Sequence, residues 1–404
     1  MRKYSWVAVS LFFFGAIAEN RNPVEDINNA DLTVDKGDSS QVGNRFDTAA
    51  EKIAGTYVNK KKIPRLEKHS KFIISAWNKL IKNSLGHVPD WTEKNLSKYI
   101  QKFDTLFYPF GGPDVSYAIS FFPNAKRYIL VGLEPLGNFD QIEDSLKNDE
   151  YYDSLQTAFS TYLEKGYFVT SEMQKHLSNK ATRGGLNLVL LALKKLGFSI
   201  KKIENCFIDA NGEIVKSDQN SIECVKIVCQ KNSHEKEIYY IKTNLDNENI
   251  KLDNLIKFIQ QFEFSTFVKS SSYAMHNRNF SKIRSFILDQ TSCILQDDTG
   301  VPFNFFRKNW DIHIFGAYTE PTLAVFQIYK QNSLKEYYLK NKAGAIPFPI
   351  GYRYTRRAPK EDASLAKKSV KPNLIFVISR KKLIERQLNE LRDRLVKKKC
   401  NCYK

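Results

Sequence analysis

The first candidate site begins at a glycine turn that follows a short apolar run. A second apolar run follows the turn, and an acidic residue lies on each side of this second run. Gly111 and Gly112 follow a short apolar run, Asp114 comes two residues later, and Glu134 follows a second apolar run. A glycine turn lets a ligand approach the backbone, and the start of a helix after such a turn favours anions. An acid after the next strand can accept hydrogen bonds from ribose hydroxyls. Gly111 and Gly112 are therefore ligand-binding candidates for a nucleotide or S-adenosylmethionine, although Pro113 and Asp114 also make an ordinary helix start.

The second group of candidates surrounds an acidic turn. Asp297 and Asp298 precede Thr299-Gly300, and this sequence is also common in turns that bind nothing. Adjacent carboxylates at a strand end can bind a cation or share a proton. His276 or His313 would serve as the base or ligand, but His313 alternates with isoleucines and equally suits a solvent-facing strand position. The remaining candidates are Arg307, as a ligand-binding residue, Lys269 and Tyr273.

Two common catalytic signatures are missing from the sequence. It contains neither HExxH, typical of zinc hydrolases, nor GxSxG, typical of serine hydrolases. Cys400 and Cys402 have no nearby histidine or third cysteine, so they do not form a zinc motif. The sequence thus predicts no metal site and identifies no cofactor. An enzyme stays among the alternatives, because catalytic triads are defined in space rather than in sequence.

The remaining cysteines are Cys206, Cys224, Cys229 and Cys293. Cys206 lies on a predicted strand that neighbours the segment containing Cys224 and Cys229. A disulfide from Cys206 to either of these is expected in an oxidising compartment, and free buried thiols are the equal alternative.

The elements around the glycine turn form a βαβ unit. Residues 105–110 and 128–132 are predicted strands, and residues 115–122 have helical spacing between them. Such a unit implies parallel strands that are buried on both faces. Residues 222–229 and 237–243 alternate apolar and polar positions and predict an antiparallel hairpin. The expected fold is α/β, with a mixed sheet flanked by helices and a Rossmann-like unit near residues 105–134.

Hydrophobic periodicity predicts the other elements. Asp90 and Glu93 form a capping box that would start a helix at Asp90. Further helices are expected over residues 66–83, 140–163, 171–178, 186–196, 254–262, 280–289, 323–338 and 381–399, and further strands over residues 203–208, 265–269, 293–296, 312–318 and 373–378.

The N-terminus has the layout of a secretory signal peptide. Arg2 and Lys3 precede an apolar run, and Ala16 and Ala18 are the small residues of a cleavage site before Glu19. An uncleaved N-terminal anchor is the alternative. No later segment reaches the ~20 apolar residues that a membrane-spanning helix needs. We therefore expect a periplasmic or secreted protein that loses residues 1–18, and export argues against a diffusible nucleotide cofactor.

Composition divides the remaining chain into three parts. Residues 19–50 are polar and predict a flexible leader. Residues 51–345 are expected to form one α/β domain. Residues 346–404 combine a proline-rich basic loop, a last strand and a basic helix whose leucines would dock on the body.

The chain is basic, with a net charge of +18. Loss of Arg2 and Lys3 leaves 18 − 2 = +16. Lysines occur along the whole chain, which favours scattered solvated charge over a nucleic-acid site. An anionic envelope component, such as lipid or polysaccharide, is the alternative partner, and the basic helix at residues 381–399 would contact it.

Three segments and one acidic turn carry a resemblance to known sequences. Residues 107–114 read FYPFGGPD, residues 121–125 read FFPNA, and residues 132–137 read GLEPLG. Residues 296–302 read QDDTGVP, and Trp310 belongs to the same pattern. The chain resembles a family of exported bacterial proteins with no established activity. The resemblance implies export and kinship, and it supplies no catalytic residues.

These observations favour an exported protein that binds a ligand or partner at the strand ends of an α/β domain. The first alternative is a hydrolase or transferase, and it would require its acidic and histidine residues to converge in one cleft. The second alternative is an interaction protein that uses a basic surface. The residues of the enzyme alternative are Asp114, Glu134, His276, Asp297 and Asp298.

Overall fold

A computed structural model describes the chain over residues 39–57, 63–100, 103–166, 177, 182, 184–216, 221–306, 308–321, 324–353 and 371–388. The side chains of residues 39–44, 161, 165 and 353 lie outside this description. The expected signal peptide, Arg307, Cys400 and Cys402 also fall outside it, as does almost all of the helix expected over residues 171–178.

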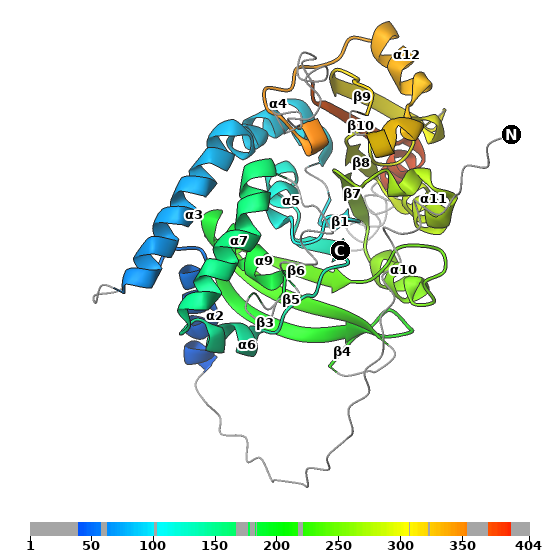
Figure 1. Ribbon diagram of the computed structural model, residues 1–404. Helices are drawn as coiled ribbons and strands as arrows, with labels where there is room; N and C mark the ends of the chain where they lie inside the picture. Colours follow the sequence, from blue (N-terminus) through cyan, green and yellow to red (C-terminus); the bar gives the residue numbers. More distant parts are fainter. Residues whose placement is uncertain are drawn as a thin grey trace, which may run out of the picture. The chain divides into compact units, whose positions relative to one another are not determined.

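Ten strands form one mixed sheet in the order β4-β3-β5-β6-β2-β1-β7-β8-β10-β9. Figure 1 shows the sheet running from β3 and β4 to β9. The strands are β1 (Thr105–Tyr108), β2 (Arg127–Gly132), β3 (Ser199–Ile208), β4 (Ile214–Val215), β5 (Ile222–Lys231), β6 (His234–Lys242), β7 (Phe264–Val268), β8 (Cys293–Gln296), β9 (Trp310–Gly316) and β10 (Asn373–Ser379).

The middle of the sheet is parallel. β6, β2, β1, β7 and β8 all run the same way. Across the sheet from β6 to β8, these five strands are the third, second, first, fourth and fifth of the set in chain order. This is the order of the doubly wound Rossmann fold. The predicted α/β class and its βαβ unit are confirmed, and so is the hairpin, because β5 pairs antiparallel with both β3 and β6.

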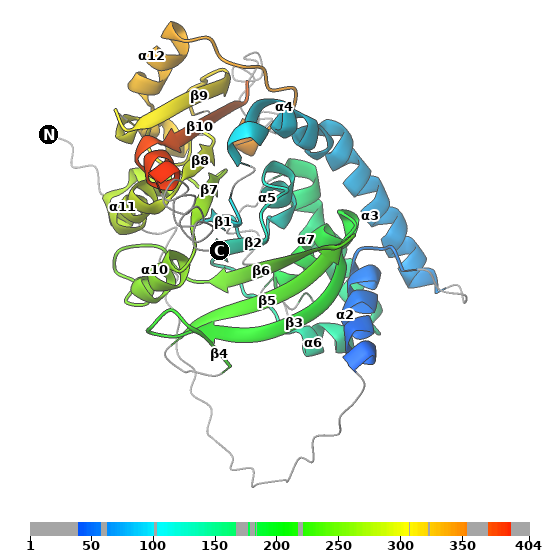
Figure 2. The same ribbon diagram turned by 180° about the vertical axis from the view of Figure 1, so that it is seen from behind.

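Helices cover both faces of the sheet (Figure 2). Successive side chains of a strand point to opposite faces, and each face therefore buries its own set of apolar residues. One cluster joins the sheet to α3, α4, α5, α7 and α9, and the other joins it to α10, α11 and α12. The helices are α2 (Ser39–Ile53), α3 (Pro64–Asn83), α4 (Val88–Ile100), α5 (Val115–Phe121), α6 (Phe139–Ser145), α7 (Asp149–Lys165), α9 (Leu186–Lys195), α10 (Leu252–Gln260), α11 (Ser281–Gln290) and α12 (Asn332–Lys340).

The predicted flexible leader does not extend to residue 50. Helix α2 begins at Ser39, and Phe46, Ala49, Ala50 and Ile53 are buried. These residues recur at helical spacing and form one apolar stripe despite the polar residues between them. Small alanines on the buried face explain why composition alone suggested a leader.

Apart from shifts of one or two residues at helix ends, the capping or continuity of the helices differs from the prediction at three places. α4 begins at Val88, directly after the short 3-10 helix η1 (Leu85–His87), so Asp90 lies in its first turn and does not cap it. Residues 140–163 form two helices, α6 and α7. Residues 323–338 divide into the 3-10 helix η5 (Ala324–Tyr329) and α12. This second break occurs at Gln331, whose backbone N–H donates to the Tyr318 hydroxyl at 2.9 Å.

The boundary predicted at residue 345 does not separate two parts of the described chain. β10 lies between β8 and β9 and pairs antiparallel with both of them. Phe348 and Ile350 are buried in the cluster that joins the sheet to α3, α4, α5, α7 and α9. The basic segment after β10 is helical over residues 380–388. Its Leu383 and Leu388 are 43% and 53% exposed, so these two leucines do not dock as expected.

No helix within the described residues combines the length and apolar character required to cross a bilayer.

Candidate functional site

Five of the predicted site residues lie along one edge of the sheet. Because the five central strands are parallel, their carboxyl ends share that edge. Asp114 follows β1, Glu134 follows β2, and Lys269 follows β7. Asp297 and Asp298 follow β8. All five side chains are buried and have hydrogen-bonding partners, so they do not line an open cleft in this structure.

Asp114 and Lys269 occupy the point where the strand order reverses, between β1 and β7. In open α/β sheets this is the usual place for a ligand. The Lys269 Nζ lies 2.9 Å from the Asp114 Oδ2, and both side chains are only 1% exposed. Lys269 also donates to the Gly166 carbonyl at 2.6 Å, and its ammonium lies 4.0 Å from the centre of the Tyr117 ring.

Three hydroxyl groups complete the surroundings of Asp114. Tyr108 donates to it at 3.1 Å, Ser116 at 3.2 Å and Tyr162 at 2.9 Å. Burial and the charge of Asp114 raise the pKa of Tyr108 and of Tyr162 well above the usual range, so both remain donors. Asp114 also caps α5 by accepting from the Tyr117 backbone N–H at 3.5 Å. Its role as a helix start is thus confirmed, together with a buried ion pair that sequence spacing does not reveal.

Glu134 is held against the glycine turn. Its Oε1 accepts from the Tyr240 hydroxyl at 2.6 Å, and its Oε2 accepts from the Leu133 N–H at 3.1 Å. Burial raises the pKa of this carboxyl group. A Cβ atom at residue 112 would lie 2.7 Å from Glu134 Oε1, and one at residue 132 would lie 2.2 Å from it. Gly112 and Gly132 therefore make the space in which this carboxyl group sits.

Asp297 is bound by backbone and hydroxyl donors. Its Oδ2 accepts from the Ser270 N–H at 2.9 Å, and its Oδ1 accepts from the Thr299 N–H at 3.0 Å. Burial, followed by the charge of Asp298, raises the pKa of Asp297 to about 6. A Cβ atom at residue 351 would lie 2.3 Å from Asp297 Oδ2, so Gly351 packs directly on this carboxylate.

Asp298 connects the same edge to β10 and to the segment after β7. It accepts from the Tyr273 hydroxyl at 2.6 Å and from the Asn373 amide at 3.0 Å. Its charge partly offsets the effect of burial on His276, whose pKa is lowered to about 4. His276 is therefore neutral at pH 7, and its buried Nε2 has no hydrogen-bond partner. His313 lies mid-strand on β9 beside the Tyr99 and Phe376 rings, away from these carboxylates.

Backbone strain is concentrated at the same edge. Among the described residues, five that are not glycine have a positive φ. Phe110 follows β1, and Ser270, Ser272 and Tyr273 follow β7, with φ values of 52–60°. The Ser270 hydroxyl is also buried without a hydrogen-bond partner. Strained residues cluster at functional sites because the surrounding structure must hold them there. Nothing in the sequence marks these positions, since serine, tyrosine and phenylalanine ordinarily avoid this conformation.

Aromatic residues from two short helices cover this part of the edge. Tyr329 of η5 stacks on Tyr273, with ring centres 5.1 Å apart and planes at 8°. Tyr352 of η6 (Gly351–Arg353) donates to the Ser270 carbonyl at 2.9 Å, and its hydroxyl lies 2.9 Å from the Ser272 hydroxyl. Their contribution could not be predicted from the sequence, because both segments are distant from β7 along the chain.

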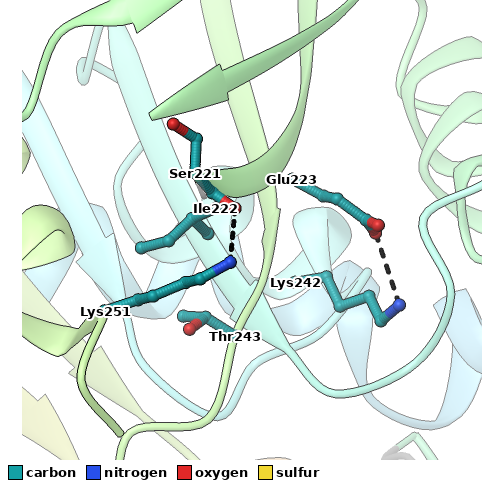
Figure 3. A pocket seen from close by; sticks show the side chains of 6 residues that line it. All are labelled: Ser221, Ile222, Glu223, Lys242, Thr243 and Lys251. Atoms are coloured by element: carbon teal, nitrogen blue, oxygen red, sulfur yellow. Dashed lines mark hydrogen bonds and ion pairs between the residues drawn. The ribbon is translucent and has the colours of Figure 1, made fainter. Parts of the chain in front are cut away.

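A small polar pocket of about 170 Å³ lies at the carboxyl end of β6 (Figure 3). Lys242 at its wall donates to Glu223 at 3.3 Å, and Lys251 donates to the Ser221 carbonyl at 3.0 Å. Lys242 pairs with Gly132 of β2, which places the pocket next to the strand that leads to Glu134. None of its lining residues is among the candidates predicted from the sequence. The lining residues are Ser221, Ile222, Glu223, Lys242, Thr243 and Lys251.

Within the described part of the chain, no three histidine, cysteine or acidic side chains are arranged to hold a metal ion. No protein-family model matches this sequence, and no curated protein matches it either.

Proposed function

We propose that this chain is an exported protein that binds a small ligand with neighbouring hydroxyl groups at the carboxyl edge of β1 and β2. Because export argues against a nucleotide cofactor, the ligand would be a compound present outside the cytosol, such as a sugar or a free nucleoside. One observation carries the proposal. Glu134, at the end of β2, is buried against the Gly112 turn that follows β1. An acid in this topological position accepts hydrogen bonds from ribose hydroxyls in Rossmann-type folds.

The Glu134 carboxylate can accept a further hydrogen bond from such a ligand. Three protein donors engage the Glu134 carboxyl group: the Tyr240 hydroxyl and the backbone N–H groups of Leu133 and Glu134. An ionised carboxylate can accept about four hydrogen bonds, so one acceptor site is left for a ligand hydroxyl. The protein donors hold the group in one orientation, and pre-ordering of this kind lowers the cost of binding. The pocket on the neighbouring strand carries Lys242 and Lys251 against one acid, Glu223, and this positive balance would favour a ligand that also carries negative charge.

Ligand binding is tested by thermal shift with the purified chain. Adenosine, S-adenosylmethionine and a nucleoside diphosphate are compared with their 2′-deoxy or 3′-deoxy analogues. A ligand that prefers the native state raises the melting temperature by mass action. We expect a rise with at least one intact diol, a loss of that rise in Glu134→Gln, and no loss in Glu235→Gln, whose side chain is exposed. Equal shifts for diol and deoxy compounds would exclude this mode of recognition.

Export is tested by cell fractionation and N-terminal sequencing. We expect a mature chain that begins at Glu19, because Ala16 and Ala18 provide the small residues of the cleavage site. A full-length chain in the cytosolic fraction would contradict export. That result would leave the ligand-binding test unaffected, because the thermal shift uses purified protein.

The second candidate function is a hydrolase or transferase that uses the β7–β8 side of the edge. The observation in its favour is the strained segment after β7, where His276 lies next to the paired carboxylates. Burial lowers the pKa of His276 to about 4, so the imidazole is unprotonated at pH 7 and would act as a weak general base. Hydrolase or transferase activity that is lost in His276→Gln and retained in His313→Gln would support this function. Equal activity of the two variants would rule out His276 as the general base.

A further inference from the structure

Cys206 and Cys224 lie directly opposite each other on neighbouring antiparallel strands. In the register of β3 and β5, Cys206 pairs with Cys224. Both thiols are free and buried, they belong to the same apolar cluster, and they hydrogen-bond to each other. The alternative partner, Cys229, pairs with Ile200 and belongs to the cluster on the other face of the sheet. The structure therefore leaves Cys224 as the partner of Cys206.

We propose that Cys206 and Cys224 form a redox site that closes into a cross-strand disulfide in an oxidising compartment. Side chains directly opposite in an antiparallel pair have Cβ atoms about 4.5–5.5 Å apart, and a disulfide needs about 3.5–4.5 Å. The bond thus requires the two strands to approach by about 1 Å or less. This site is independent of the ligand proposed above, although export would bring the chain to such a compartment.

The chemistry is a thiol–disulfide exchange with a low-molecular-weight disulfide or a disulfide-bonded oxidoreductase. The Cys206 thiolate attacks the oxidant, whose S–S bond breaks and releases one thiol. The Cys224 thiolate then attacks the mixed disulfide and releases the second thiol. Each cysteine loses one proton, and the two electrons reduce the oxidant to two thiols. Cys206 suits the attacking role because its hydrogen bond from Cys224 lowers its thiol pKa, whereas burial raises that of Cys224.

The bond would tie β3 to β5, and the start of β5 forms one wall of the polar pocket. Ile222 and Glu223 line the pocket and directly precede Cys224 on β5. Cys224 also pairs with Ile241 of β6, next to Lys242 at the opposite wall. Between Cys206 and Cys224 the chain leaves β3, forms β4 and returns as β5. A disulfide at this position would close that excursion and restrict the movement of the pocket wall.

Peptide mapping provides a direct test, because trypsin separates the cysteines. Cleavage after Lys202, Lys216, Lys226 and Lys231 places Cys206 in residues 203–216, Cys224 in residues 217–226 and Cys229 in residues 227–231. The purified full chain is equilibrated with oxidised glutathione, alkylated, digested without reductant and analysed by mass spectrometry. We expect residues 203–216 to be linked to residues 217–226, and the link to disappear after reduction.

Alanine variants provide the controls, since the thiols lie in apolar surroundings. Cys206→Ala and Cys224→Ala should each abolish the link, and Cys229→Ala should keep it. The oxidised wild type should melt a few degrees higher than the reduced protein, and Cys206→Ala should show no such difference. Free alkylated thiols in both peptides after oxidation would overturn the proposal. A link from residues 203–216 to residues 227–231 would overturn it as well. Neither outcome depends on where the cell places the chain.

Discussion

The carboxyl group of Glu134 occupies the space where residue 112 would carry a side chain. Gly112 has a φ of +53°, and a Cβ added there would meet Glu134 Oε1 at 2.7 Å. The turn after β1 and the acid after β2 are thus fitted to each other in the folded protein. Both conditions, the positive φ and the close approach, require glycine.

A Gly112→Ala variant should therefore destabilise the protein by about 2–4 kcal/mol, from left-handed strain and the clash together. Gly197→Ala is the matched control, because Gly197 also has a positive φ of +85° but its nearest neighbour, the end of the Lys231 side chain, is 3.5 Å away. It should cost only about 1 kcal/mol. Urea unfolding measures both values. Replacing Glu134 by alanine in the Gly112→Ala background should recover part of the loss, and no recovery would show that the clash contributes little.

The buried ion pair between Asp114 and Lys269 predicts that the effects of mutating its two partners are not additive. Lys269→Met leaves the Asp114 carboxylate buried without its cation, and Asp114→Asn leaves the ammonium without its anion. Removal of one partner of a buried pair typically costs about 3–5 kcal/mol. The double variant should be more stable than either single variant, because it leaves no isolated charge.

The exposed pair between Lys68 and Asp153 serves as the control, since its side chains are 69% and 62% exposed. Lys68→Met should change the free energy of unfolding by less than about 1 kcal/mol. Chemical denaturation of these four variants and the wild type compares the two pairs. Equal effects for Lys68→Met and Lys269→Met would contradict a structural role for the buried pair.

Asp297 should make stability depend on pH in a direction opposite to that of a salt-bridged acid. Its folded-state pKa is about 6, above the value of about 3.9 for an unfolded aspartate. Between these values the folded state binds more protons than the unfolded state. Its contribution to stability is therefore present below about pH 4 and is lost as pH rises through 6.

The comparison with Asp297→Asn isolates this contribution. The stability of the wild type relative to the variant should fall by about 2–3 kcal/mol between pH 4 and pH 7. Subtraction of the two curves removes the opposing contribution of His276, which is the same in both proteins. Denaturant unfolding at several pH values measures the difference. A difference that rises with pH would mean that Asp297 has a lowered pKa in the folded protein.

Local patterns in the sequence predicted the parallel core well. The glycine turn, α5 and the apolar run of β2 are encoded by neighbouring residues, so their order and spacing predicted a βαβ unit. The position of Glu134 at its end followed from the same unit. What local patterns could not provide were contacts between distant segments. Lys269 reaches Asp114 only because β7 returns to pair with β1, and such pairing leaves no trace in either segment alone.

Contacts between distant segments also explain why the predicted leader and the predicted boundary at residue 345 were wrong. Composition around Phe46 is polar, yet its apolar stripe is buried by helices and strands from elsewhere in the sequence. β10 follows a long basic segment and nevertheless lies inside the sheet, because its backbone pairs antiparallel with both β8 and β9. Composition describes the residues near a position, whereas burial depends on what packs there.

The strain at Ser270 gives a last prediction. Ser270 has a φ of +54°, and its N–H is oriented toward Asp297 while its hydroxyl has no partner. Glycine adopts this conformation without the penalty of about 1–2 kcal/mol that a Cβ imposes. Ser270→Gly should therefore stabilise the protein by about 0.5–1 kcal/mol, after allowance for the greater entropy of glycine in the unfolded state. Thermal and urea unfolding measure the gain. Ser285→Gly, at an exposed position inside α11, is the control and should lose about 0.5–1 kcal/mol. A loss in both variants would show that the Ser270 side chain stabilises the fold, which would remove the strain argument for this part of the site.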